Sequence, residues 1–180
     1  DIVVILYDHL SAKQVEDYIN VVRYFTDVTD GYAANRVDIC RSALVEGLIV
    51  KDSNRVIEAR DALSIVFPYV TSKEGYYADG SYVDHITIPY THSYGAVLIS
   101  GISKIMYLLG DSSWDFVDPQ VNNVFNWIYD SYEPAIYKMQ AFDCVRGRAI
   151  SRENSTDLTT GKDILGSIAL IAEAANEQDK

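Results

Sequence analysis

The sequence predicts an all-α domain of paired helices. Apolar residues recur at the three- and four-residue spacing of an amphipathic helix in a series of separate stretches. Several of these stretches start or stop at residues that favour a helix terminus. No part of the chain shows the strong alternation of apolar and polar residues that indicates a half-buried strand.

Three amphipathic helices are predicted in the first half, after residues 2–10, which are expected to complete an earlier helix. The first begins with Ser11 and Gln14, which match the capping-box pattern. The third has Asp52 or Ser53 as its N-cap and is expected to end or kink at Pro68. Their apolar faces carry Val15, Tyr18, Ile19, Val22 and Phe25, then Val37, Cys40, Leu44 and Leu48, then Val56, Ala59, Leu63 and Val66.

Three more helices are predicted in the second half. The first closes at Gly110, and the second opens with Asp118 as N-cap and Pro119 at the first helical position. The third is expected to start within residues 159–161. Their apolar faces carry Leu98, Ile102, Ile105 and Leu109, then Val121, Val124, Phe125 and Ile128, then Ile164, Leu165, Ile168, Ile171 and Ala175.

Two connections, residues 69–94 and 133–160, are far longer than the common length of about 4–6 residues. Short extended pieces are expected within residues 76–88 and 136–142. Long ordered connections between packed helices often carry function. The site is therefore expected in these two connections, and residues 1–180 are expected to form a single domain.

Composition and charge limit the possible partners. The net charge of −11 disfavours nucleic acid, because binding phosphates requires clustered lysine and arginine. A polyanionic substrate would need a local basic patch, for which Arg146, Arg148 and Arg152 are the candidates. No apolar run approaches the roughly 20 residues that span a bilayer. The only two cysteines make neither a disulfide framework nor a zinc site, and Cys40 is expected to be a buried free thiol.

Acid–base chemistry is suggested by His85 and Tyr94. His85 lies among polar loop residues, and a free imidazole, with a pKa of about 6.5, can serve as a general base. Tyr94 precedes Gly95 at a predicted helix start, and a phenol normally serves as a proton donor. Taken alone, His85 fits an exposed or hydrogen-bonded structural histidine better, and Tyr94 fits a packing residue among 14 tyrosines better.

Recognition of a carboxylate is suggested by Asn35 at a helix start and by Arg148 and Arg152 in a glycine- and serine-rich loop. The helix terminus and the planar guanidinium both suit an anionic group. The structural alternatives are a helix cap for Asn35 and surface ion pairs for the arginines. Asp79 or Glu153 would instead serve a glycoside hydrolase, although their spacing does not demand the facing carboxyls that such an enzyme needs.

Four motifs in register resemble polysaccharide lyase family 8, which contains the hyaluronate, chondroitin AC and xanthan lyases. Asn35 to His85 spans 50 residues and His85 to Arg148 spans 63, as in the hyaluronate and chondroitin members. The resemblance covers essentially the whole chain. The motifs are an Asn-Arg-Val-Asp helix start at 35–38, Asp-Gly-Ser-x-x-x-His at 79–85, a tyrosine nine residues after that histidine, and Arg-Gly-Arg-x-Ile-Ser-Arg at 146–152.

The resemblance implies a function and a set of site residues. Asn35 would neutralise a substrate carboxylate, His85 and Tyr94 would form the acid/base pair, and Arg148 and Arg152 would lie beside the tyrosine. The family cleaves uronic-acid glycans by β-elimination, with no metal and no redox cofactor. Hyaluronan or chondroitin is the expected substrate. Substrate-binding roles are further expected for Asn154, Tyr90 and Arg146.

The resemblance also implies a larger protein. The chain is expected to be the C-terminal part of an incomplete (α/α) toroid of helical hairpins with long active-site loops, in a bacterial lyase that is secreted or held at the cell surface. Partners would be the acidic polysaccharide, an upstream aromatic patch and downstream β-sandwich domains, with no nucleic acid and no membrane span. At the usual Gly-Ala position the chain has His92 and Ser93, which are expected to narrow the space near Tyr94. A non-catalytic glycan-binding helical module is the alternative function.

Overall fold

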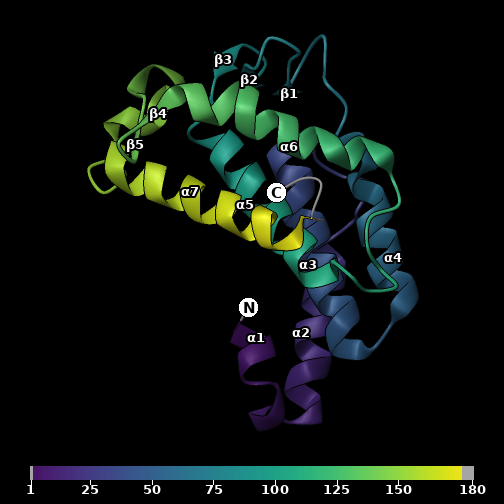
Figure 1. The fold of residues 1–180 in the computed structure, drawn as a ribbon. Helices are drawn as coiled ribbons and strands as arrows, with labels where there is room; N and C mark the ends of the chain where they lie inside the picture. The colour runs from purple at the N-terminus through teal and green to yellow at the C-terminus, as the bar shows by residue number, and fades with distance from the viewer. Residues whose placement is uncertain (1, 176–180) are drawn as a thin grey trace.

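A computed structural model describes residues 2–175, and these residues confirm the all-α prediction (Figure 1). Short 3-10 helices and one π-helix, Ile128–Tyr132, join the longer helices. Within the described residues, no helix has both the length and the hydrophobicity that crossing a bilayer requires. The α-helices are α1 (Ile2–Ile5), α2 (Ala12–Phe25), α3 (Ala33–Val50), α4 (Ser53–Asp61), α5 (Tyr94–Leu109), α6 (Asn123–Trp127) and α7 (Asp157–Ala174).

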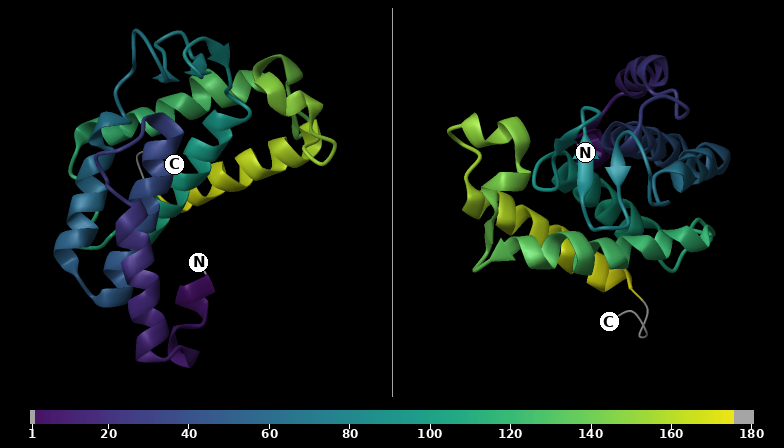
Figure 2. Two further views of the ribbon diagram at one scale, coloured as in Figure 1. Left: turned by 180° about the vertical axis from the view of Figure 1, so that it is seen from behind. Right: turned by 90° about the horizontal axis from the view of Figure 1, so that it is seen from above.

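The core lies between α3, α5 and their neighbours. Helix α5 packs against both α3 and α7, and α4 packs against α3 (Figure 2). The apolar faces predicted for α3, α5 and α7 supply most of the side chains that these contacts bury. Among the fully or nearly fully buried residues are Val37, Cys40 and Leu44 of α3, Leu98, Ile102 and Ile105 of α5, and Ile164 and Ile171 of α7.

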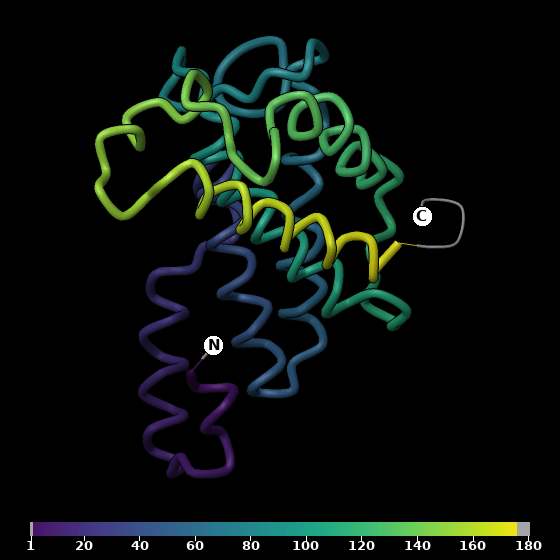
Figure 3. Tube along the Cα trace, turned by 60° about the vertical axis from the view of Figure 1, so that its left-hand side comes forward, coloured from purple at the N-terminus to yellow at the C-terminus, as the bar shows by residue number. Residues whose placement is uncertain are grey.

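Helices α1 and α2 form an arm that extends away from this body (Figure 3). Helix α1 buries no residue, and Ile19 is the only residue of α2 that is buried. Phe25, which was predicted on the apolar face of α2, is 71% exposed. The periodicity thus identified the apolar side of α2, but the described residues cover that side only in part.

Two small antiparallel sheets lie in the long connections, where short extended pieces were expected within residues 76–88 and 136–142. Strands β1 (Gly75–Tyr76), β2 (Tyr82–Asp84) and β3 (Ile88–Pro89) pair in that order. Strands β4 (Ile136–Tyr137) and β5 (Gln140–Ala141) form a hairpin. Both sheets lie at the end of the molecule opposite to the arm (Figure 1).

Most helix boundaries follow the predicted capping chemistry. Ser11 and Gln14 form the complete capping box, and the Asp52 carboxylate accepts the backbone N–H of Asn54 and of Arg55. The start predicted for α7 was a few residues too late. Thr156 is the N-cap, because its hydroxyl oxygen accepts the backbone N–H of Thr159.

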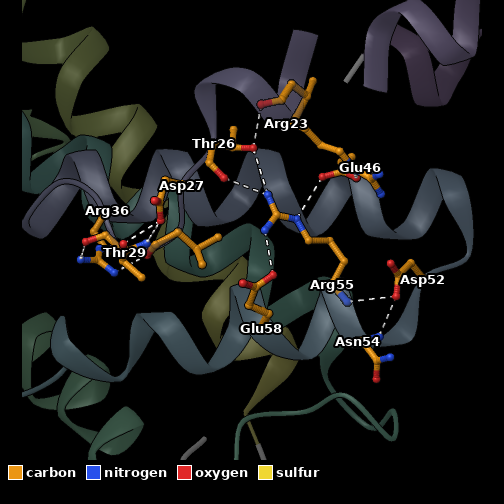
Figure 4. Close-up of polar contacts among 12 residues, drawn as sticks. Arg23, Thr26, Asp27, Thr29, Arg36, Glu46, Asp52, Asn54, Arg55 and Glu58 are labelled. Atoms are coloured by element: carbon orange, nitrogen blue, oxygen red, sulfur yellow. Dashed lines mark hydrogen bonds and ion pairs between the residues drawn. The ribbon is translucent and has the colours of Figure 1, made fainter. Parts of the chain in front are cut away.

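An ion network around the buried Glu46 fixes the chain just before α3 (Figure 4). The Glu46 side chain is fully buried, and its two oxygens accept bonds from Arg23 Nε at 2.8 Å and Arg55 Nε at 3.0 Å. Arg55 also donates to the Thr26 carbonyl at 2.8 Å, and Arg36 donates to the carbonyls of the same loop. The network therefore holds the loop that leads into the first turn of α3, where Asn35 lies.

Candidate functional site

The two long connections meet at the start of α5. The backbone N–H of His92 donates to the Val145 carbonyl at 3.0 Å. The backbone N–H of Arg148 donates to the Tyr90 hydroxyl at 3.2 Å, and Arg148 Nη2 donates to the Tyr94 hydroxyl at 3.2 Å. We call residues 143–156 the arginine loop. These hydrogen bonds hold the arginine loop against the segment that carries His85 and Tyr94.

Three aromatic rings form a cluster beside this contact. The His85 and Tyr94 ring centroids lie 4.8 Å apart, and those of Tyr90 and Tyr94 lie 5.1 Å apart. Tyr90 is fully buried, Tyr94 is half-buried, and the His85 side chain is 37% exposed. His85 and Tyr94 are therefore adjacent at the surface, with Tyr90 beneath them.

Asp84 fixes the orientation of His85. One carboxylate oxygen, Oδ1, lies 2.7 Å from His85 Nδ1 and accepts the His85 backbone N–H at 2.8 Å. A carboxylate accepts hydrogen bonds and does not donate them, so this contact places the proton on Nδ1. The other ring nitrogen, Nε2, then carries the lone pair that can accept a proton.

Asn35 lies in the first turn of α3. It is exposed, and its backbone N–H donates to the Tyr32 carbonyl at 3.0 Å. The preceding residue, Ala34, is buried, and its backbone lies close to the Tyr82 hydroxyl. Tyr82 in turn donates to Asp84 Oδ2 at 3.1 Å. A short chain of contacts thus connects the helix start that carries Asn35 with His85.

Arg152 and Asn154 lie near the end of the arginine loop. Both are exposed, and within residues 2–175 neither side chain has a hydrogen-bond partner. Arg152 is placed by its backbone, whose N–H donates to the Ala149 carbonyl at 3.0 Å. Their side chains are therefore available to a ligand.

Tyr90 and Arg146, which were expected to bind substrate, are buried instead. Arg146 is 3% exposed and pairs with Asp143 through Nη1 at 2.6 Å, while Nη2 donates to the Ser155 carbonyl. Gly147 has φ of +52°, and a Cβ at this position would overlap the Tyr90 ring. The loop can approach Tyr90 this closely because residue 147 has no side chain.

His92 does not take the place expected for it. It is 1% exposed, its ring stacks on Tyr132 at 6.3 Å between centroids, and Nδ1 lies 3.3 Å from the Phe142 carbonyl. Burial, and secondarily the nearby Arg146 charge, lowers the pKa of His92. The side chain serves the packing of the β4–β5 hairpin against the start of α5.

Buried tyrosines support the first turn of α5. The Tyr132 hydroxyl donates to the Gly95 carbonyl at 2.7 Å and also bonds the Tyr76 hydroxyl. Burial raises the pKa of both phenols, so they stay protonated. Sequence reasoning missed these supports and also Tyr82. The position of Asp84 next to His85 in the sequence was the only signal for any of these supporting contacts.

Comparisons with known proteins point to one family. The family model for "Polysaccharide lyase family 8, N terminal alpha-helical domain" matches residues 1–180. Xanthan lyase of Bacillus sp. (strain GL1) is 41% identical over 97% of this chain and 19% of its own length, and hyaluronate lyase of Thermasporomyces composti is 34% identical over 99% and 23%. Chondroitin AC lyase of Streptomyces coelicolor A3, solved in complex with chondroitin sulphate, superposes with a TM-score of 0.94 at 35% identity over 99% of this chain and 26% of its own.

These relatives set the scale of the match. The chain spans roughly a fifth to a quarter of the length of the proteins it matches. The match includes all of the described helices and both long connections. The chain therefore belongs to polysaccharide lyase family 8 and comprises its N-terminal α-helical domain segment.

Proposed function

We propose that this chain supplies the acid/base and charge-neutralising part of the active site of a lyase that cleaves uronic-acid glycans by β-elimination. The observation that carries the proposal is the assembly of His85, Tyr94 and Arg148 from two distant connections. The ring centroids of His85 and Tyr94 lie 4.8 Å apart, and Arg148 Nη2 lies 3.2 Å from the Tyr94 hydroxyl. Such a cluster suits proton transfer at two neighbouring atoms of a substrate.

The reaction begins with binding of the uronate. Asn35 donates a hydrogen bond to the C5 carboxylate, which stabilises the negative charge that develops when the C5 proton leaves. The exposed Arg148 and Arg152 provide positive charge for a polyanion on a chain whose net charge is −11. Asn154 contacts the sugar from the same loop.

Bond making and breaking then follow. A base takes the C5 proton, and the electron pair of that C–H bond forms the C4–C5 double bond. The bond from C4 to the glycosidic oxygen breaks, and the Tyr94 hydroxyl gives its proton to the departing oxygen. The products are a 4,5-unsaturated uronate and a new reducing end.

Two residues are candidates for the base. His85 Nε2 is free to accept the C5 proton because Nδ1 is held by Asp84. An ionised Tyr94 could instead take the C5 proton and return it to the leaving oxygen. With His85 as the base, His85 then releases its extra proton to solvent and Tyr94 takes a proton from solvent, so that both return to their starting protonation states. Comparison of His85→Ala with Tyr94→Phe distinguishes these routes, because elimination by His85→Ala assigns the base role to Tyr94.

The buried residues of the site have a supporting role in this proposal. Tyr90 holds the arginine loop through its hydroxyl, and Arg146 braces the loop through Asp143 and Ser155. Neither needs to contact the sugar. The exposed Asp79 accepts from Ser81 N–H at 3.0 Å and from its hydroxyl at 2.7 Å, which gives it a turn-capping role rather than that of a hydrolase acid.

The substrate and the rest of the lyase are part of the proposal. Hyaluronan and chondroitin fit the uronate chemistry, and the 41% identity to a xanthan lyase adds xanthan. We propose that the chain works as the C-terminal part of a toroid, with an aromatic patch and β-sandwich domains supplied by the remainder of a secreted bacterial lyase.

The test uses the complete lyase that contains this chain. It is incubated separately with hyaluronan, chondroitin and xanthan, and both ultraviolet absorbance and reducing ends are followed. Growth of the absorbance of the conjugated C=C together with reducing ends supports elimination. Reducing ends without that absorbance indicate a hydrolase, and binding without either signal indicates a glycan-binding module. The 180-residue chain alone is expected to be feebly active.

A further inference from the structure

We propose that Asp84 and Tyr82 are positioning residues that hold the His85 imidazole in one tautomer and at a fixed place relative to Asn35. The inference rests on the proposed function, because it assigns His85 a part in proton transfer. It follows from the hydrogen bonds, the backbone and the burial of this segment.

The first step is the bond between Asp84 and His85. Asp84 is 6% exposed, and its Oδ1 lies 2.7 Å from Nδ1 of the ring and 2.8 Å from the backbone nitrogen of His85. Because the same oxygen contacts the backbone and the ring, it fixes the side chain relative to its own main chain. Rotation of the imidazole would break the ring contact and leave the buried carboxylate oxygen with fewer partners.

The second step is the backbone of the turn. His85 has φ of +49° and Ile86 has φ of +72°, which are left-handed values that non-glycine residues adopt rarely. Such a conformation persists only when surrounding contacts fix it. Besides Asp84, these contacts are the bond from Thr87 N–H to the His85 carbonyl at 2.9 Å and the bond from Ile86 N–H to Glu74 at 3.3 Å. The turn is thus held in the shape that brings the imidazole to Tyr94.

The third step is the support of Asp84 by Tyr82. The two residues are two positions apart on β2, so their side chains lie on the same face of the strand. The Tyr82 hydroxyl donates to Asp84 Oδ2 at 3.1 Å, and Tyr82 is fully buried. Burial, and secondarily the Asp84 charge, raises the pKa of Tyr82, which keeps its hydroxyl a donor.

The last step connects this pair to α3. The Tyr82 hydroxyl lies close to the backbone of Ala34, the residue before Asn35. The contacts therefore run from the helix start through Tyr82 and Asp84 to His85. In β-elimination the base and the carboxylate-binding residue act on neighbouring atoms, so their separation has to be held within a narrow range. Tyr82 and Asp84 set that separation.

The test compares variants of the complete lyase by steady-state kinetics across pH. Asp84→Asn should lower kcat by about 10²-fold or more, with KM within about threefold of the unaltered value. Tyr82→Phe removes one hydroxyl and should lower kcat by about tenfold. Asp79→Asn, an exposed carboxylate in the same connection, is the matched control and should leave both constants unchanged.

A pH profile distinguishes positioning from general support of the fold. The groups that face His85 are Asp84 on β2, Tyr90 before α5, Tyr94 at the start of α5, Arg148 through Tyr94, and Glu74 through the next backbone N–H. Asp84 is the charged side chain that contacts the imidazole, so Asp84→Asn should change the acidic limb of the kcat/KM profile, whereas Asp79→Asn should leave it unchanged.

The outcomes are distinct. Near-normal kcat with an unmoved acidic limb in Asp84→Asn overturns the assignment, and a rise in KM alone shows that Asp84 contacts substrate instead. If Asp84→Asn fails to fold, as judged by circular dichroism, Tyr82→Phe decides the question, and normal kcat in that variant overturns the assignment. If the unaltered lyase forms no unsaturated product, the proposed function itself is overturned.

Discussion

Arg148 Nη2 donates a hydrogen bond to the Tyr94 hydroxyl at 3.2 Å, and this bond joins residues that are 54 positions apart in the chain. The guanidinium thereby contacts the one phenol of the site that is only half-buried. The bond also connects the arginine loop to the first residue of α5. Two predictions concern its two ends.

Replacement of Arg148 by lysine should reduce elimination even though the charge is kept. A lysine is a point charge and cannot present a planar fork to the phenol oxygen and the substrate together. Loss of a charge-assisted hydrogen bond corresponds to about a ten- to hundredfold lower kcat/KM. Steady-state assay of unsaturated product measures the effect. Arg41→Lys on α3, whose arginine pairs with Asp38, is the control, and equal losses in both variants would contradict the specific role of Arg148.

Replacement of Tyr94 by phenylalanine in the complete lyase should abolish turnover while substrate binding is largely kept. The ring and its packing against His85 remain, but the proton for the leaving oxygen is gone, which should lower kcat by about 10²–10⁴-fold. Turnover and equilibrium binding of an oligosaccharide are both measured. Tyr107→Phe, on the same helix and 59% exposed, should match the unaltered enzyme. Near-native turnover by Tyr94→Phe would refute the assignment.

Alanine substitutions at two glycines should act in opposite directions. Gly147→Ala forces a left-handed alanine against the Tyr90 ring, so the free energy of unfolding should fall by more than about 1 kcal/mol, and activity should fall with it. Gly166 lies inside α7, with open space around the position of a Cβ. Gly166→Ala should therefore raise the free energy of unfolding by about 0.5–1 kcal/mol. Denaturant unfolding compares the two, and a stabilised Gly147→Ala would contradict the close contact with Tyr90.

His92 should make the folded state sensitive to acid. Its pKa is lowered in the fold by burial and by Arg146, so the unfolded chain binds the proton more readily. Above pH about 6.5, His92 does not reduce the free energy of unfolding. As the pH falls from there toward the lower pKa of the folded state, the unfolded chain binds the proton first, and the free energy of unfolding decreases. Denaturant unfolding at several pH values checks this for the unaltered chain and for His92→Gln. The glutamine variant should show a smaller loss of stability over that window, and identical losses would contradict the prediction.

The two cysteines should differ sharply toward thiol reagents. Cys40 is fully buried in α3, and burial raises its pKa to about 11, whereas Cys144 is exposed in the arginine loop. Reaction of a chromogenic disulfide with the native chain should therefore modify one thiol quickly and the second only after unfolding. Cys144→Ser should remove the fast reaction. Fast modification of that variant would show that Cys40 is accessible.

The helices of the body could be predicted because their periodic faces are also the faces that pack. Val37, Cys40 and Leu44 on α3 and Leu98 and Ile102 on α5 are all buried as expected. The face of α2 could not be predicted with the same success, since periodicity indicates which side is apolar but not whether another element covers it. The short strands were expected only as extended pieces, because two or three residues carry too little alternation to define a strand.

Three side chains of the candidate site were predicted from the sequence, but the residues that support them were not. The order of His85, Tyr94 and Arg148 carried the resemblance, and the structure brings their side chains together. Burial of Tyr90 and Arg146 depends on how the arginine loop packs, which the sequence does not reveal because arginine is usually exposed. The pairing of Tyr82 with Asp84 likewise depends on the register of β2.

The arm formed by α1 and α2 has a consequence for local stability. The free energy of a local opening follows the buried apolar contacts that the opening breaks, and the arm buries only Ile19. Backbone amides of the arm should therefore exchange with solvent through small fluctuations, whereas those of α3 and α5 exchange only through global unfolding. Because the contacts among His85, Tyr94 and Arg148 are all made outside the arm, the arrangement that we propose for proton transfer can persist while the arm opens and closes.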